Sequence, residues 1–354
     1  MSRVLVATTS WPRHPADPAG SFVAASVDWL RADGLAVQVV HAPRPAAGLP
    51  ELIEASPAAG LAAGAAALAR LGASLHLRLR RGDVVVAHWL PTALPVVCRA
   101  PTLAWAHGGD VALLERLAGG RRIARALDAH AAALAFVSAD LRDRFAALLG
   151  RTPRAPQWLL PMGVAAPRPD AAFAATLRAR AAGRRIIATV GRLVPIKGLD
   201  VLARALGPRD DVVWFAAGEG PERDALARLC SSFEPLGLLD PPRRDALLAA
   251  ADVFALPSRP LGRRTEGTPV ALLEALASGV PTVATATGGV PALAREAGAS
   301  LVPPDDPAAL ALAIDALLGA PAALRDRHRR AAARFAWPVV GPDHARAVRY
   351  LVGR

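Results

Sequence analysis

The sequence predicts an α/β protein with two doubly wound halves, each built on a parallel sheet. Short apolar runs alternate along the chain with longer stretches of helical periodicity, a pattern typical of βα units. A proline-rich segment at residues 152–170 interrupts this alternation, which restarts after it. The length of 354 residues fits two domains, each large enough for its own core.

In the first half, the opening residues read as a strand that leads into a Ser-Trp-Pro turn. A helix is expected over Ser21–Ala32, because Val23, Val27 and Leu30 share one face at helical spacing. Apolar runs of strand length predict five strands, at Val4–Thr8, Val37–His41, Val84–His88, Thr102–Ala106 and Leu134–Ser138.

The second half repeats the same alternation after the proline-rich segment. Strands are expected at Arg185–Val190, Val212–Ala217, Val253–Leu256 and Thr282–Ala284. Helices are expected at Leu199–Leu206, Glu222–Leu229, Arg243–Ala250 and Pro269–Ala277. Two such halves joined by a linker usually bind a ligand in the cleft between them, at the carboxyl ends of the strands.

Composition excludes several classes of protein. A hydrophobic fraction of 53% and a charged fraction of 20% exclude a disordered chain. The two cysteines, Cys98 and Cys230, are far apart, which excludes a disulfide scaffold or a thiolate zinc site and fits a reducing compartment. The net charge of +12 admits acidic partners, namely nucleic acid, an anionic membrane or a phosphate-bearing substrate, or else spreads over solvated faces.

Neither the start of the chain nor its most apolar stretch predicts a membrane anchor. The first residues lack the apolar core of a signal peptide. The stretch Ala58–Ala69 is mostly Ala and Gly and is too short and too weakly hydrophobic to span a bilayer. We therefore expect a cytoplasmic protein.

The loop after the first strand of the second half carries the clearest functional signal. Gly191-Arg192-Leu193-Val194-Pro195-Ile196-Lys197-Gly198 joins a buried strand to a helix, and Lys197 is the only lysine in the chain. A glycine at a strand end and a helix N-terminus favour an anion, and Arg192 and Lys197 can converge on it. We expect a diphosphate site here; two solvated bases on an ordinary loop are the alternative.

A second glycine-rich turn follows the next strand, at Gly218-Glu219-Gly220-Pro221. It lacks the GxGxxG pattern of a dinucleotide site and the GK[ST] of a Walker loop. Such a turn indicates either a ligand or tight packing.

Two carboxylates flank the start of a helix further along. Thr268 suits an N-cap and Pro269 the first helical position, so Glu266 precedes the helix and Glu274 lies inside it, in an apolar run. A buried carboxylate needs hydrogen-bond donors, and ligand hydroxyls supply them. The pair predicts a polyol site, with a dipole partner and a surface Glu as the alternative.

Taken together, these segments resemble a known family. GRLVPIKG, GEGPER, ADVFALPS, EGTPVALLEALASGVP and TATGGVP, in this order and spacing, look like the C-terminal domain of retaining GT-B glycosyltransferases of family four, glycosyltransferase group 1. AHWLPTALP, AWAHGGDV, Gly20-Ser21-Phe22-Val23 and Phe335-Ala336-Trp337 extend the resemblance over nearly the whole chain.

The resemblance implies a fold and a domain plan. Two Rossmann-like doubly wound domains would face each other across a cleft: residues 1–168 for the acceptor, residues 169–336 for the nucleotide-sugar donor, and residues 337–354 as a helix returning to the first domain. It also implies a retaining, metal-independent hexosyl transfer from a UDP- or GDP-sugar in polysaccharide or glycoconjugate biosynthesis. No cofactor is implied beyond the donor substrate.

The resemblance also assigns roles to individual residues. Arg192 and Lys197 would hold the diphosphate and stabilise the leaving group. Glu266, helped by main-chain groups of Gly267 and Thr268, would bind the sugar, and Glu274 would bind the ribose. The remaining implied contacts are His107, which would face the donor sugar from the first domain, and the donor-binding positions Gly20, Gly191, Gly218, Gly220 and Pro269.

The acceptor side carries weaker signals. A basic amphipathic helix over Leu114–Leu127 could rest on an anionic membrane or could simply be solvated. The Arg-rich loop 259–265 could meet a phosphate-bearing acceptor or could simply be solvated. Where the family often has Pro-Asn-Gly-Val-Asp, this chain has Pro161-Met162-Gly163-Val164-Ala165, and Ala292 stands where the family often has a Glu after the glycine pair. A glycan, lipid-linked or small-molecule acceptor all fit.

The sequence admits two other functions. A catalytically silent nucleotide-sugar-binding module would bind nucleotide without turnover. Nucleic-acid binding is disfavoured by the aromatic fraction of 5% and by the lack of a recognisable motif.

Overall fold

The computed structural model describes residues 2–14, 16–17, 19–43, 56–267 and 269–353. By internal contacts the chain divides into two compact units. The first contains residues 1–12, 19–162 and 340–354, and the second contains residues 13–18 and 163–339. The sequence predicts a first domain ending at residue 168, and the contacts divide the chain at residues 162/163 and 339/340. The returning helix does begin at Trp337, as the sequence predicts.

The first unit is built on a parallel six-stranded sheet with the order β2-β1-β3-β4-β5-β6. Because the order reverses beside β1, the carboxyl ends of β1 and β3 form a topological switch point, where open α/β sheets bind ligands. The strands are β1 (Val4–Thr8), β2 (Val37–His41), β3 (Val84–His88), β4 (Thr102–Ala106), β5 (Ala133–Phe136) and β6 (Gln157–Leu159).

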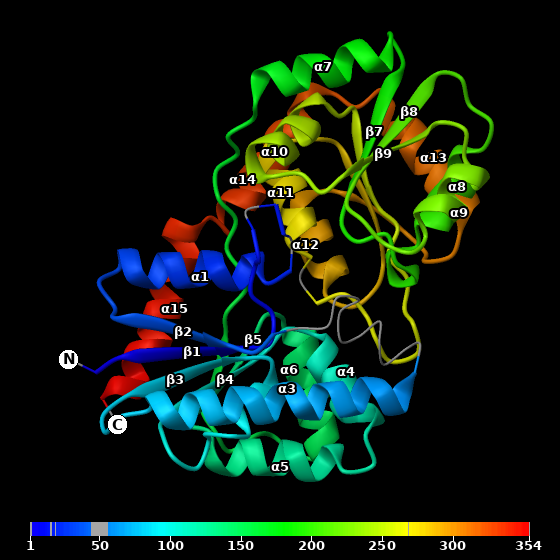
Figure 1. The fold of residues 1–354 in the computed structure, drawn as a ribbon. Coiled ribbons are helices and arrows are strands. Elements are labelled where there is room, and N and C mark those ends of the chain that lie inside the picture. Colours follow the sequence, from blue (N-terminus) through cyan, green and yellow to red (C-terminus); the bar gives the residue numbers. More distant parts are fainter. Residues whose placement is uncertain (1, 15, 18, 44–55, 268, 354) are drawn as a thin grey trace. The chain divides into compact units, whose positions relative to one another are not determined.

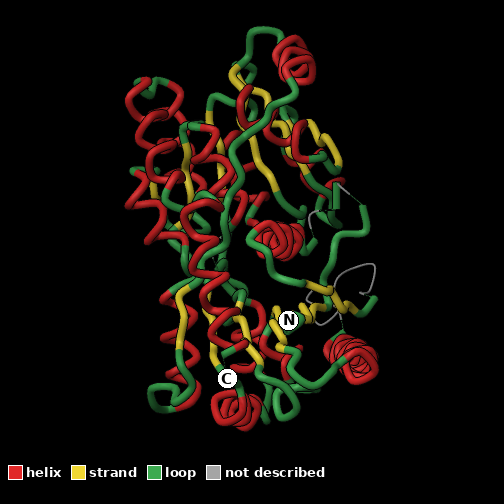
Figure 2. Tube along the Cα trace, turned by 90° about the vertical axis from the view of Figure 1, so that its left-hand side faces the viewer, coloured by secondary structure: helices red, strands yellow, loops and turns green. Residues whose placement is uncertain are grey.

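Helices cover this sheet, and the central strands are fully buried (Figures 1 and 2). They are α1 (Ser21–Ala32), α3 (Pro57–Arg78), α4 (Gly109–Arg116), α5 (Gly120–His130), α6 (Ala139–Leu149) and the part of α15 (Trp337–Val352) that belongs to this unit, with a 3₁₀ turn η1 (Leu90–Ala93).

The second unit is also a parallel six-stranded sheet, ordered β12-β11-β10-β7-β8-β9. This is the strand order of a dinucleotide-binding Rossmann sheet, with its switch point between β7 and β10. The strands are β7 (Arg185–Val190), β8 (Val212–Ala217), β9 (Phe233–Gly237), β10 (Val253–Leu256), β11 (Thr282–Thr285) and β12 (Ser300–Val302).

Alternate residues of these strands enter two separate cores, one on each face of the sheet. Ile186 and Phe215 pack under one set of helices, and Ile187 and Trp214 pack under the other. The first set is α7 (Ala171–Ala181), α10 (Pro241–Ala250), α11 (Val270–Ser278), α12 (Val290–Ala297) and α14 (Ala322–Ala333), and the second is α8 (Leu199–Leu206), α9 (Arg223–Leu229) and α13 (Pro307–Leu318) (Figure 1).

One expected helix is divided into two. The basic segment Leu114–Leu127 is not one helix, because α4 ends at Arg116 and α5 begins at Gly120. A Cβ on Gly120 would lie 1.7 Å from the carbonyl oxygen of Leu114, so the chain turns sharply there. The apolar stretch Ala58–Ala69 is only the first part of the 22-residue α3.

Candidate functional site

The loop after β7 curls back on the end of its own strand. The 3₁₀ turn η2 (Pro195–Lys197) leads into Gly198, which caps α8 with a left-handed backbone at φ 60°. A small pocket forms where this loop meets the end of β10, and its lining includes Gly191, Arg192, Lys197 and Pro257. Two basic side chains therefore border a pocket at the switch point of the second sheet.

Lys197 and Glu266 form a largely buried ion pair. Lys197 Nζ lies 2.6 Å from Glu266 Oε1, and the two side chains are 17% and 14% exposed. The hydroxyl of Ser258 donates to the same carboxylate oxygen over 2.9 Å. These residues lie far apart in sequence and meet because β7 and β10 are neighbours in the sheet.

The charge of Glu266 is stabilised by its neighbours. Burial alone raises the pKa of this carboxyl, but the Lys197 charge, hydrogen bonds from Lys197 and Ser258, and the Arg192 charge together hold its pKa below the ordinary value. Glu266 is therefore ionised at neutral pH. Arg192 is close enough to act on that carboxylate electrostatically.

The glycines of the second turn pack against the first loop. A Cβ on Gly218 would lie 1.9 Å from the carbonyl oxygen of Gly191, and a Cβ on Gly220 would lie 2.1 Å from that of Leu193. The main-chain N–H of Leu193 also donates to Glu219 O over 2.9 Å. Tight packing, one of the two interpretations of this turn, is thus sufficient to require both glycines.

The entry to α11 differs from the expected one by a residue. Pro269 occupies the N-cap position with extended backbone, and the helix begins at Val270 rather than at Pro269. Thr268, the expected N-cap, lies outside the described residues. Gly267 and Pro269 are described and lie between Glu266 and α11.

Glu274 is buried in the middle of α11 and has one cationic neighbour among the described residues. Arg244 Nη2, from α10, lies 3.2 Å from Glu274 Oε1, and Asp245 Oδ1 lies 3.5 Å from the same Arg244 nitrogen. Burial raises the pKa of Glu274, the Arg244 charge lowers it and the Asp245 charge raises it, and the resulting pKa is about 7. At neutral pH this carboxyl is divided between its two protonation states.

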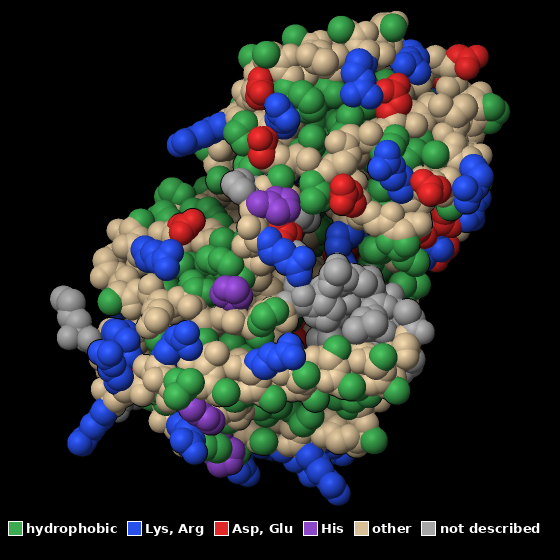
Figure 3. Space-filling model, in the orientation of Figure 1, with side chains coloured by type: hydrophobic (Ala, Val, Ile, Leu, Met, Phe, Trp, Pro, Cys, Tyr) green, Lys and Arg blue, Asp and Glu red, His purple; other side chains and the backbone are tan. Residues whose placement is uncertain are grey.

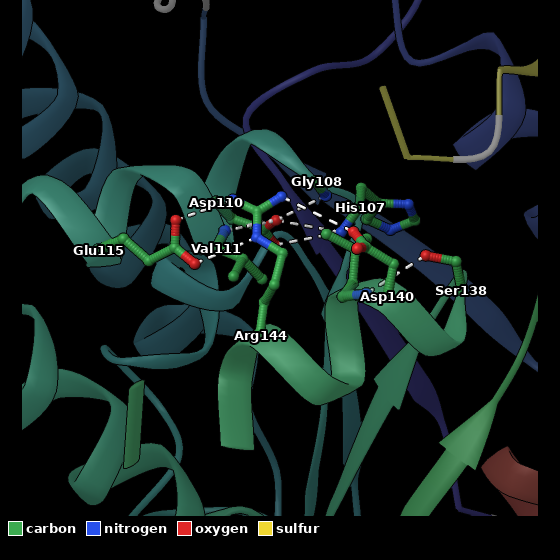
Figure 4. Close-up of polar contacts among 9 residues, drawn as sticks. His107, Gly108, Asp110, Val111, Glu115, Ser138, Asp140 and Arg144 are labelled. Carbon is green, nitrogen blue, oxygen red and sulfur yellow. Dashed lines mark hydrogen bonds and ion pairs between the residues drawn. The ribbon is translucent and has the colours of Figure 1, made fainter. Parts of the chain in front are cut away.

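In the first unit, His107 follows β4 and sits on a loop organised by Asp110. One carboxylate oxygen of Asp110 accepts from the main-chain N–H groups of His107, Gly108 and Val111, over 3.1, 2.9 and 3.0 Å. The other accepts from Leu90 N over 3.0 Å. Figure 4 shows His107 and Asp110 on this loop, with the Arg144–Glu115 pair beyond them.

The His107 ring lies in a group of aromatic side chains. Phe22 and Trp105 contact it, with ring centroids 5.0 and 5.6 Å away, and His88 lies 5.1 Å away. Burial, followed by the charges of His88 and His344, lowers the pKa of His107 well below its ordinary value. His107 is therefore neutral at pH 7.

Gly20 belongs to the same unit and follows β1. Its φ is 75°, and a Cβ there would lie 2.1 Å from the carbonyl oxygen of Ser10. The residue therefore closes the loop after β1 on itself.

Sequence reasoning missed the residues that hold the predicted ones in place. Ser258 supports Glu266, Arg244 pairs with Glu274, and Asp110 and His88 surround His107. Pro257-Ser258 and His107-Gly108-Gly109-Asp110 stood inside motifs already noted, whereas nothing in the local sequence marks Arg244.

The first residue of the Arg-rich loop is held by ion pairs. Arg259 is engaged by Asp200 and Asp305 of its own unit. Within the ranges that the structure describes, no group of three or more His, Cys, Asp or Glu side chains is arranged to hold a metal ion.

Comparison with known proteins places these loops in a family. Residues 184–320 match the model of glycosyl transferases group 1. The chain is 33% identical over 250 residues to the GDP-mannose-dependent alpha-(1-6)-phosphatidylinositol monomannoside mannosyltransferase of Mycobacterium tuberculosis, covering 62% of this chain and 64% of that protein. It is 35% identical over 179 residues to the D-inositol 3-phosphate glycosyltransferase of Mycolicibacterium vanbaalenii, covering 44% and 38%. The chain thus spans less than two thirds of the length of these curated relatives.

Solved structures agree on the fold. Sucrose-phosphate synthase from Thermosynechococcus elongatus superposes with a TM-score of 0.79 at 18% identity, over 100% of both chains. Anabaena HepE in complex with UDP-glucose superposes with a TM-score of 0.74 at 18% identity, over 99% of this chain and 100% of that one. The chain therefore has the two-domain α/β fold of GT-B proteins, and its residues 184–320 match the model of glycosyl transferases group 1.

Proposed function

We propose that this protein is a glycosyltransferase that moves a hexosyl group from a UDP- or GDP-sugar to an acceptor hydroxyl. The observation that carries the proposal is the buried Lys197–Glu266 pair at the β7/β10 switch point. A cation, a polyol-binding carboxylate and a glycine-lined pocket at one strand end suit a sugar diphosphate. The GDP-mannose dependence of the mycobacterial relative and the UDP-glucose complex of HepE support such a donor.

The proposed reaction breaks the bond between the anomeric carbon and the diphosphate oxygen and forms a bond to the acceptor oxygen on the same face. The acceptor proton leaves with the departing diphosphate. Negative charge grows on that diphosphate, and Lys197 and Arg192 stabilise it. Lys197 has three N–H donors, so its ion pair with Glu266 leaves donors for phosphate oxygens.

The remaining roles follow the same proposal. Glu266 is ionised and accepts hydrogen bonds from sugar hydroxyls, with Gly267 and Pro269 shaping the loop beside it, and Glu274 accepts from the ribose hydroxyls. His107, from the first unit, contacts the donor sugar. We propose retention of anomeric configuration, turnover without a metal ion, and a glycan, lipid-linked or small-molecule acceptor in polysaccharide or glycoconjugate biosynthesis.

A thermal-shift panel of UDP, GDP, ADP, CMP, UDP-sugars and GDP-mannose, without added metal, tests donor binding. A nucleotide at about 100 times its Kd stabilises the native state by about 2.7 kcal/mol. Lys197→Ala should abolish the shift. Arg209→Ala is the control and should keep the shift, because Arg209 pairs with Asp211 and Asp315, which are not part of the site. No shift with any diphosphate in folded protein would contradict the proposal.

Turnover separates an enzyme from a silent binding module. With the donor identified, product analysis in EDTA by NMR gives both the metal requirement and the anomeric configuration. Binding without transfer to any acceptor would favour the silent module. Loss of activity in EDTA, or an inverted product, would contradict the corresponding part of the proposal.

We propose further that the protein is cytoplasmic and contacts an anionic membrane peripherally. Within the described part of the chain, α3 is the one single helix long and apolar enough, by length and composition, to cross a membrane, and α13 with α14 passes the same test only as a pair bent by 108°. Its Leu71 and Leu75 are buried against the unit, whereas Leu77 is 86% exposed beside the exposed Arg78. Figure 3 shows scattered hydrophobic side chains and a few basic ones on the part of this face where α3 runs.

Vesicle sedimentation tests this contact. Binding to vesicles with anionic lipid but not to purely zwitterionic ones is expected, together with weaker binding of Leu77→Glu. Leu312→Glu is the matched control, because Leu312 is 73% exposed on the other unit. Equal binding of both variants and the parent would contradict a role for α3.

A further inference from the structure

His88 occupies the carboxyl end of β3, at the switch point of the first sheet. Its side chain is fully buried, and its Nδ1 lies 3.0 Å from Nε2 of His107. The ring stacks on Trp105 with centroids 4.9 Å apart and planes 21° apart, so the imidazole has a fixed orientation. Among the described residues, His88 thus makes the only side-chain hydrogen bond to the His107 ring.

Both rings are neutral at pH 7. Burial, followed by the His344 charge, lowers the pKa of His88 to about 3, and burial also lowers the pKa of His107 well below its ordinary value. In a hydrogen bond between two neutral imidazoles, one ring donates and the other accepts. The direction of this bond therefore fixes which nitrogen of His107 carries its proton.

The surroundings of His88 decide the direction. Its other nitrogen, Nε2, is buried and has no hydrogen-bond partner among the residues that the structure describes. If His107 donated, the proton of His88 would lie on this Nε2 and leave a buried N–H without an acceptor, which is rare in proteins. If His88 donates from Nδ1, only a bare nitrogen is buried there.

We propose that His88 is a positioning residue: its Nδ1–H donates to Nε2 of His107 and holds His107 in the tautomer with its proton on Nδ1. His107 then presents a hydrogen-bond donor, not a base, on its partly exposed side. Asp110 fixes the main chain of the same residue, so both its backbone and its ring are oriented. With the proposed function, on which this last step rests, the donor serves a sugar oxygen.

Long-range ¹H–¹⁵N NMR of ¹⁵N-histidine-labelled protein tests the tautomer without any substrate. Protonated and bare ring nitrogens resonate at well separated shifts. His107 should show a protonated Nδ1 and a bare Nε2, and His107→Asn should remove that spectrum and so assign it. A protonated Nε2 on His107 in the parent protein would overturn the proposal, whatever the protein catalyses.

Two substitutions of His88 distinguish hydrogen bonding from packing. His88→Asn places an N–H where Nδ1 of His88 lies and should keep the tautomer of His107 with its proton on Nδ1. His88→Phe fills the volume of the imidazole without a hydrogen-bond donor and should shift His107 toward a protonated Nε2. If His88→Phe folds and leaves the tautomer of His107 unchanged, His88 does not position His107. The same conclusion follows if His88→Phe does not fold and His107 of the parent carries its proton on Nε2.

Kinetics then connect the tautomer with turnover. His88→Phe should lower kcat about 10-fold with a smaller change in KM, and His88→Asn should recover most of the loss. The matched control is His130→Asn, at the exposed end of α5. Equal losses in the Phe and Asn variants would overturn the proposal. A parent that shows the expected tautomer but no transferase activity would refute the proposed function alone.

Discussion

The partly protonated Glu274 gives a pH dependence to donor binding that can be worked out in advance. Its pKa is about 7 because burial and Asp245 raise it more than Arg244 lowers it. Ribose hydroxyls donate hydrogen bonds, so the proposed contact uses the ionised carboxyl. Donor binding should therefore strengthen as pH rises through 7.

The size of the effect follows from the ionised fraction. With a pKa of about 7, about one tenth of the protein is ionised at pH 6 and about nine tenths at pH 8. If only this form binds, the apparent Kd falls about 10-fold between these two pH values. Glu274→Gln should bind the donor weakly, with an affinity that changes little over the same range.

Isothermal titration calorimetry with an intact nucleotide sugar is the appropriate assay. Such a donor carries a diphosphate diester with no terminal phosphate monoester, whose second pKa near 6 would otherwise obscure the result. Calorimetry in buffers of different ionisation enthalpy should also show proton release on binding at pH 7. A flat pH profile in the parent, or tighter binding at pH 6 than at pH 8, would refute the reasoning.

Three further predictions concern stability, each measured by urea unfolding. Lys197→Met should lower the free energy of unfolding by about 3 kcal/mol, because it removes the ion-pair partner of the largely buried Glu266 carboxylate. Adding Glu266→Gln to this variant should restore most of the lost stability. Additive losses in the double variant would show that the two residues are not coupled. Gly220→Ala places a Cβ 2.1 Å from a main-chain oxygen and should lower the free energy of unfolding by roughly 3 kcal/mol. Gly319→Ala is the control, because the space around that residue is open, and it should lower the stability much less. Equal losses of stability would contradict the packing argument. His344 has a pKa of about 4, lowered mainly by burial, so the buried neutral ring stabilises the fold above its unfolded pKa of about 6.5 and loses that contribution as pH falls. Between pH 7.5 and 5.5 the free energy of unfolding of the parent should fall by about 1.4 kcal/mol more than that of His344→Gln. Parallel pH profiles would contradict the burial of a neutral ring.

The central strands could be predicted from sequence because they are buried on both faces. Such strands are continuous apolar runs, and Val84–His88 and Arg185–Val190 occur in the structure with the bounds that sequence suggested. Three of the four edge strands were missed for the opposite reason, whereas the fourth, β2, has the bounds that the sequence predicts. Most residues of β6, β9 and β12 are partly exposed, so these strands lack a continuous apolar run.

The candidate site was only partly visible in the sequence. Motif residues such as Lys197 and Glu266 could be named from the sequence. Their close contact could not be derived from their spacing in sequence, because it depends on the pairing of β7 with β10. Arg244 could not be found in advance. Its position beside Glu274 depends on how α10 packs against α11, which no local pattern encodes.

The pairing of Lys197 with Glu266 also gives this protein a built-in reporter. Because it is the only lysine among 354 residues, amine-directed chemistry such as reductive ¹³C-methylation labels one side chain besides the α-amino group. That side chain lies 2.6 Å from the carboxylate at the centre of the candidate site. A single methyl resonance therefore follows occupancy of this pocket directly, with no other lysine to resolve or mutate away.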